Sequence, residues 1–213
     1  MKKFLLAILL LGIAGFLVWK FVFSGKKNHA DSGEKPQALV VSKHSEAFNS
    51  SVRQLLSDYY GLTEAFVNWD TVAVNAAAQR LQGSVDSLKL SEMEKDSALY
   101  PTAQMQWEGV RSEVAGMITD PTVEEKKASL NMLSQQIFDL LRIVRYDAAK
   151  IYFQECPMAL NNYEMAGNWL SPVDSIRNPY LGLKDPKYGK DMLTCGSTKV
   201  TLDYTVADTT KKE

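Results

Sequence analysis

Four segments of the chain repeat apolar residues at steps of three and four, which places those side chains on one face of an α-helix. Ser45 and Asp70 are predicted N-caps, and Thr122 with Glu125 forms a capping-box pattern. Amphipathic helices with short or moderate connections are typical of an up-and-down bundle, which we expect over residues 44–147. The four helices are predicted at residues 45–68, 70–88, 100–117 and 122–144.

The periodicity changes after Tyr146. Residues 151–154 form a short extended candidate, and apolar residues alternate with polar ones over residues 200–206, which is the period of a half-buried strand. The long stretch between them is aperiodic and rich in Asn, Gly, Pro and aromatic residues, so we expect it to be internally packed. Residues 148–207 are therefore predicted to form a small irregular and β cap, and residues 208–213 a polar tail.

The N-terminus carries an apolar run from Phe4 to Phe23, about the 20 residues that a helix needs to cross a bilayer. We expect residues 1–23 to be a transmembrane anchor or uncleaved signal and residues 24–43 to be a flexible linker. The two histidines, His29 and His44, are expected to be solvated linker residues. The predicted fold class is therefore mainly α: an up-and-down four-helix bundle with a small C-terminal irregular or β cap, preceded by a single N-terminal membrane helix.

Composition narrows the classes of function. The formal net charge of -1 provides no positive field for phosphate backbones, so a nucleic-acid partner is not expected. The chain contains no Gly-x-Ser-x-Gly turn, phosphate-binding glycine loop or Glu-x-x-His pair, and neither histidine lies near a cysteine in the sequence. We therefore expect a protein that is not an enzyme, and two histidines are too few for a histidine-built zinc site.

Two sulfur motifs flank the aperiodic stretch: Cys156-Pro157-Met158 before it and Met192-Leu193-Thr194-Cys195-Gly196 after it. Thiolates and thioethers are the ligands that select a soft monovalent ion such as Cu(I) or Ag(I). A Cys-x-Met step in an extended segment places both side chains on one face. The predicted metal ligands are Cys156, Met158, Met192 and Cys195.

A disulfide between Cys156 and Cys195 is the alternative interpretation of the same pair. Two cysteines that flank one irregular loop in an exported chain most simply form a bridge. In the chain-entropy model, closing a loop of about 40 residues stabilises the fold by roughly 4 kcal/mol. The two interpretations are compatible, because a reduced pair binds metal and an oxidised pair does not.

The motifs of the C-terminal part resemble an uncharacterised bacterial domain family that occurs alone or fused to periplasmic adaptor subunits of heavy-metal efflux pumps. The runs that carry this resemblance are residues 151–159, 169–171, 176–180 and 192–196. The resemblance implies an exported, helix-rich domain associated with copper or silver handling, in which Cys156, Met158, Met192 and Cys195 occupy signature positions.

From the residues and the resemblance together, we expect a domain anchored in the inner membrane that faces the periplasm. Its expected function is to bind or sense Cu(I) or Ag(I) in support of heavy-metal efflux. Its expected partners are the membrane, through the N-terminal helix, and an efflux-pump adaptor or another exported metal-handling protein. The alternative is a structural or protein-docking module without metal, stabilised by the Cys156 to Cys195 disulfide.

Overall fold

The structure is a computed structural model that describes residues 43–205, which belong to one compact unit. The predicted anchor (1–23), nearly all of the predicted linker (24–43) and the predicted tail (208–213) lie outside the described residues. No helix within residues 43–205 is long and apolar enough to cross a membrane.

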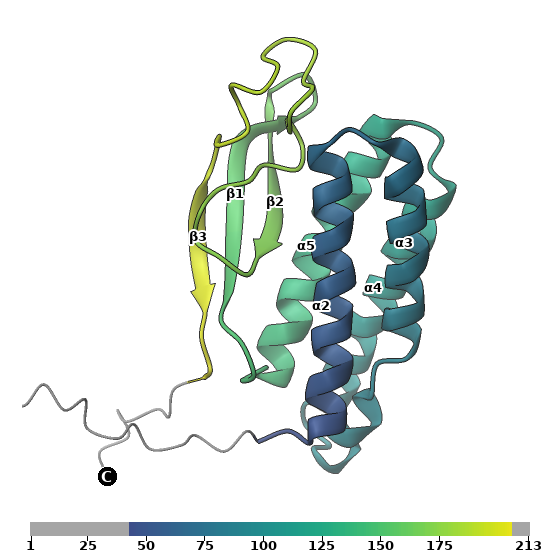
Figure 1. The fold of residues 1–213 in the computed structure, drawn as a ribbon. Coiled ribbons are helices and arrows are strands. Elements are labelled where there is room, and N and C mark those ends of the chain that lie inside the picture. The colour runs from purple at the N-terminus through teal and green to yellow at the C-terminus, as the bar shows by residue number, and fades with distance from the viewer. Residues whose placement is uncertain (1–42, 206–213) are drawn as a thin grey trace, which may run out of the picture. The chain divides into compact units, whose positions relative to one another are not determined.

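Four α-helices in the described part of the chain begin and end within three residues of the predicted positions (Figure 1). They are α2 (Glu46–Val67), α3 (Thr71–Asp86), α4 (Tyr100–Thr119) and α5 (Val123–Val144), with a short 3-10 helix, η1 (Leu90–Lys95), between α3 and α4. The predicted caps are confirmed: Ser45 and Asp70 accept backbone N–H groups of α2 and α3, and Thr122 with Glu125 forms a capping box at α5.

The predicted fold class is wrong, because the C-terminal part forms a regular sheet and not a small cap. Within residues 43–205, four α-helices are followed in the chain by a three-stranded antiparallel sheet. Its strand order is β2-β1-β3. The strands are β1 (Ile151–Leu160), β2 (Met165–Ser171) and β3 (Ser197–Leu202). β2 escaped prediction because its last three residues are all buried, so its sequence lacks the alternation of a strand with one exposed face.

The free edge of β2 is bound to the helices by side-chain hydrogen bonds. The Asn168 N–H donates to Asn131 Oδ1 of α5 at 2.8 Å, and the Leu170 N–H donates to the Tyr59 hydroxyl of α2 at 3.0 Å. The Tyr180 hydroxyl donates to the Asn168 carbonyl. These bonds satisfy backbone groups of a strand that has no neighbour on this side, and they fix the sheet beside α2 and α5 (Figure 1).

The Tyr59 hydroxyl continues this connection into the helices. It lies 2.6 Å from Ser134 Oγ, which in turn donates to the Leu130 carbonyl at 2.6 Å. Because the single Ser134 proton is committed to Leu130, the Tyr59 proton is donated to Ser134. All three residues are fully buried, and burial raises the pKa of Tyr59 to about 12, so its hydroxyl stays protonated.

The segment between β2 and β3 is packed against the rest of the fold. Gln154 of β1 donates to the carbonyls of Val173 and Asp174 at 3.1 and 3.0 Å, which holds the beginning of the segment on the sheet. Arg177 makes a bidentate ion pair with Glu64 of α2, with both nitrogen to oxygen distances at 2.6 Å. The expectation that this aperiodic stretch is internally packed is therefore confirmed.

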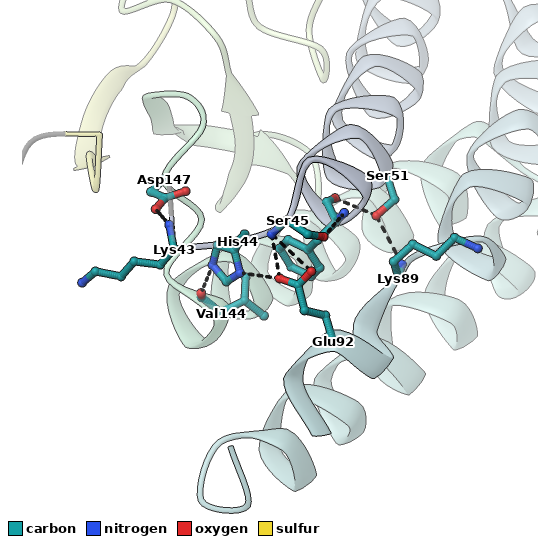
Figure 2. Close-up of polar contacts among 9 residues, drawn as sticks. Lys43, His44, Ser45, Ser51, Lys89, Glu92, Val144 and Asp147 are labelled. Carbon is teal, nitrogen blue, oxygen red and sulfur yellow. Dashed lines mark hydrogen bonds and ion pairs between the residues drawn. The ribbon is translucent and has the colours of Figure 1, made fainter. Parts of the chain in front are cut away.

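His44 is not a solvated linker residue, as we had expected from its position. Its side chain is 8% exposed, and Figure 2 shows it between two acceptors: Nε2 lies 2.8 Å from the Val144 carbonyl and Nδ1 lies 3.3 Å from Glu92 Oε1. Both carboxylate oxygens of Glu92 also accept the Ser45 N–H, at 3.1 and 3.2 Å. The first residues of the domain are thereby fixed to η1 and to the end of α5.

We predict that Tyr59→Phe destabilises the protein by about 1 to 3 kcal/mol, because the buried Leu170 amide loses its only side-chain acceptor. Urea unfolding followed by circular dichroism measures the change. Tyr100→Phe is the matched control, since that hydroxyl makes only an exposed contact at 3.4 Å, and it should change the unfolding free energy by less than about 0.5 kcal/mol. Equal effects of the two variants would contradict the prediction.

Glu92 makes the stability depend on pH. Burial tends to raise the pKa of Glu92, but hydrogen bonds from Ser45 and His44 lower it overall. A lowered pKa in the folded state means that the stabilising contribution is complete above the unfolded value of about 4.3 and is lost as the pH falls through the folded value. Glu92→Gln should therefore destabilise the protein at pH 7 and much less at pH 3, whereas the exposed Glu164→Gln should have little effect at either pH.

Candidate functional site

The two cysteines lie side by side in the folded chain. Cys156 is fully buried on β1, and Cys195 is half-buried just before β3. Both thiols are free, and Cys156 lies close enough to Cys195 to contribute to the raised pKa of the Cys195 thiol. The sequence predicted that these residues could act as a pair, and the fold brings them together.

Strand register explains why the two thiols meet. β1 and β3 are antiparallel, and Glu155 is paired with Ser197, so the residues just after Glu155 face those just before Ser197. Gly196 allows the chain to run close to the backbone of β1, and its φ is +133°. A Cβ at this position would lie 2.7 Å from the Glu155 carbonyl oxygen, so only glycine fits beside β1. This close approach of the backbone places Cys195 near Cys156.

Asn178 holds the turn that carries Cys195. Its Nδ2 donates to the Cys195 carbonyl at 3.0 Å, and its backbone N–H donates to the Leu193 carbonyl at 2.8 Å. Its Oδ1 accepts the N–H groups of Tyr180 and Leu181 at 2.8 and 3.1 Å. The side chain is fully buried, and its bonds to the Tyr180 and Leu181 N–H groups are buried with it. Sequence reasoning gave this residue no role, although an Asn-Pro pair is a recognised turn signal.

The two methionines lie at the margin of the same buried cluster. Met158 and Met192 are half-buried and pack against the core. The register between β1 and β2 shifts between Cys156 and Leu160, where Pro157 lacks an N–H for the ladder. This bulge interrupts the alternation from which we expected Met158 to share a face with Cys156. The candidate site is therefore defined by the two neighbouring thiols and not by the methionines.

Among the described residues, no histidine or carboxylate completes a cluster at the thiols. Within residues 43–205, no group of three or more His, Cys, Asp or Glu side chains is arranged to hold a metal ion. A metal ion bound between Cys156 and Cys195 would accordingly have sulfur ligands: two thiolates, with thioether sulfur as the further ligand type that the adjacent motifs provide.

The pKa of Cys195 is raised to about 12, first by burial and then by the hydrogen bond and charge of the neighbouring Cys156 thiol. Cys195 is therefore protonated at neutral pH. A protonated thiol is a poor nucleophile, which argues against covalent catalysis at this position. A ligand that displaces the proton, such as a soft metal cation, would compensate the cost of a buried thiolate.

No protein-family model, curated protein or solved structure matches this chain. The resemblance to the efflux-associated domain family thus depends on the motif residues themselves. The strongest basis for a function is the geometry of the thiol pair.

We predict that Cys195 in the reduced, folded protein is alkylated by iodoacetamide at pH 8 about 100-fold or more slowly than a free cysteine, because its thiolate population is small. The rate should rise with pH until about pH 12 and should become normal in urea. Mass spectrometry of the Cys195 peptide measures the rate. Cys156→Ser weakens one cause of the raised pKa and should accelerate alkylation; a normal rate in the folded wild-type protein would contradict the prediction.

Proposed function

We propose that this protein is a non-enzymatic, exported module that binds Cu(I) or Ag(I) between Cys156 and Cys195 in support of heavy-metal efflux. The single observation that carries the proposal is the proximity of these two thiols, which the chain brings together from the two ends of a long packed loop. Two soft ligands at one point, with no carboxylate or histidine cluster among the described residues, favour a soft ion over a hard one.

The surroundings of the thiols support this choice of ion. Cys156 is fully buried among apolar and aromatic side chains, and Tyr180 lies near it. A site with little access to water favours a monovalent ion, because two thiolates with one Cu(I) leave a net charge of only -1 to be buried. Met192, which is joined to Cys195 by a turn with an N to O distance of 3.0 Å, is the thioether best placed in the sequence to add a third ligand.

Membrane attachment and the efflux partner are further parts of the proposal. They depend on the apolar run from Phe4 to Phe23 and on the resemblance of the C-terminal motifs. A domain tethered to the inner membrane on its periplasmic side would meet a metal ion before or after an efflux adaptor handles it. Its task would be to hold the ion as a thiolate complex and pass it on, or to report its presence.

The proximity of the two thiols also favours a second candidate function. Neighbouring thiols in an exported protein are substrates for oxidation, and a bridge between Cys156 and Cys195 would close the loop and stabilise its packed form. In that case the domain would be a structural or docking module without metal. The number of free thiols in protein isolated from its own compartment distinguishes the two: two free thiols support the metal proposal, and none supports the bridge.

We predict that the reduced full-length protein in detergent binds one Cu(I) with a dissociation constant below about 1 μM, measured by competition with a chromogenic chelator. Replacing both cysteines, Cys156→Ser with Cys195→Ser, should weaken binding about 100-fold or more. Met192→Leu tests the third ligand and should weaken binding by about tenfold. The control is Met105→Leu, whose side chain is 69% exposed on α4 and should not matter. Binding weaker than micromolar, or unchanged without the thiols, would refute the proposal.

A further inference from the structure

A second feature of the fold, separate from the thiol pair, is a cavity of about 140 Å³. It lies where α2 ends, α5 begins and β1 turns into β2, which is the upper end of the molecule in Figure 1. We call it the Lys127 cavity. Its principal lining residues are Trp69, Lys127, Leu160, Asn162, Tyr163 and Asp185.

Lys127 is a largely buried lysine whose ammonium group forms no ion pair with residues 43–205. The residue is 7% exposed, and its Nζ lies 3.7 Å from the centre of the Trp69 ring. This cation-π contact occupies one side of the ammonium group, but no atom of residues 43–205 accepts a hydrogen bond from it. Burial lowers the pKa of Lys127, and the charges of Glu124 and Asp185 oppose that shift only from a distance.

Asp185 is a buried charge of the opposite sign on the same cavity. It is 5% exposed, and its carboxylate accepts the Tyr163 hydroxyl at 3.1 Å and the N–H groups of Lys187 and Tyr188 at 2.9 and 2.8 Å. In the described part of the chain, Lys127 and Asp185 line one cavity but form no ion pair with each other. The fold therefore holds two buried opposite charges apart with a small volume adjoining both.

The walls of the cavity are held by the backbone. Asn161, Asn162 and Tyr163 form the turn between β1 and β2 with φ values of +48°, +54° and +72°, an unfavourable conformation for three consecutive residues other than glycine. The Trp69 Nε1 donates to the Leu181 carbonyl at 2.9 Å, which fixes the opposite wall. A cavity with fixed walls loses little conformational entropy when a ligand enters.

The two charges select the chemistry of a ligand. A simple anion would be attracted by Lys127 and repelled by Asp185. A simple cation would be attracted by Asp185 and repelled by Lys127. A molecule that carries both charges on adjacent atoms is attracted by both walls. The volume corresponds to about four or five water molecules, which is enough for an α-amino acid with a small side chain.

We infer that the Lys127 cavity binds a free, small α-amino acid as its zwitterion, with the carboxylate at Lys127 and the ammonium group at Asp185. Trp69 and Leu160 supply the apolar surface for a short side chain. Glu124, at the exposed rim, is a second negative charge on the cavity, and its charge acts on Lys127. This inference is independent of metal binding, because none of the lining residues is part of the thiol pair.

Isothermal titration of the full-length protein in detergent with glycine, alanine and serine tests the inference. We expect a dissociation constant of about 1 mM or lower for at least one of them. N-acetylalanine and alanine amide, which each lack one of the two charges, should bind at least about tenfold more weakly, as should acetate and methylammonium. These comparisons use the wild-type protein, so they stand even if a variant fails to fold.

Variants then assign the contacts. Lys127→Met and Asp185→Asn should each weaken binding by about tenfold or more, with folding checked by circular dichroism. Lys190→Met is the matched control, because Lys190 is exposed and does not line the cavity. Cys156→Ser with Cys195→Ser should leave amino-acid binding unchanged. No binding up to about 50 mM, or equal binding of the blocked compounds, would overturn the inference.

Discussion

The fold depends on the hydrogen bonds that join the free edge of β2 to the helices. A strand edge exposes N–H and C=O groups that must find partners, and here the partners are side chains of α2, α5 and the segment after β2. The Tyr59 hydroxyl is central, since it accepts from Leu170 and donates to Ser134 in one buried chain. These bonds act together with the apolar packing of the sheet against α5 to fix its position beside the bundle.

The position of the sheet decides where the chemistry lies. β1 is the central strand, and its antiparallel partners return the chain to Cys156 from both sides. Gly196 and Asn178 then complete the approach of Cys195, one by permitting close passage of the backbone and the other by holding the turn. The thiol pair is thus a product of sheet register, and the Lys127 cavity is a product of where the same sheet meets the ends of α2 and α5.

The helices were predictable because their signals are local. The apolar spacing of three and four residues, together with caps at Ser45, Asp70 and Thr122, specifies each helix without reference to the rest of the chain. β2 was not predictable in this way, because Trp169, Leu170 and Ser171 are all buried and show no alternation. His44 was misjudged for a related reason: its acceptors, Val144 and Glu92, are distant in the sequence.

The sequence by itself determined four helices, their caps and the presence of two sulfur motifs that could act as a pair. Only the tertiary structure decided that Cys156 and Cys195 are neighbours, that β2 is a strand, and that Lys127 and Asp185 share a cavity without pairing. The physical reason is that helix hydrogen bonds join residues four apart, so a short stretch of sequence is enough to predict a helix. Strand pairing and cavity formation join distant residues, and their outcome depends on register and on how the layers pack.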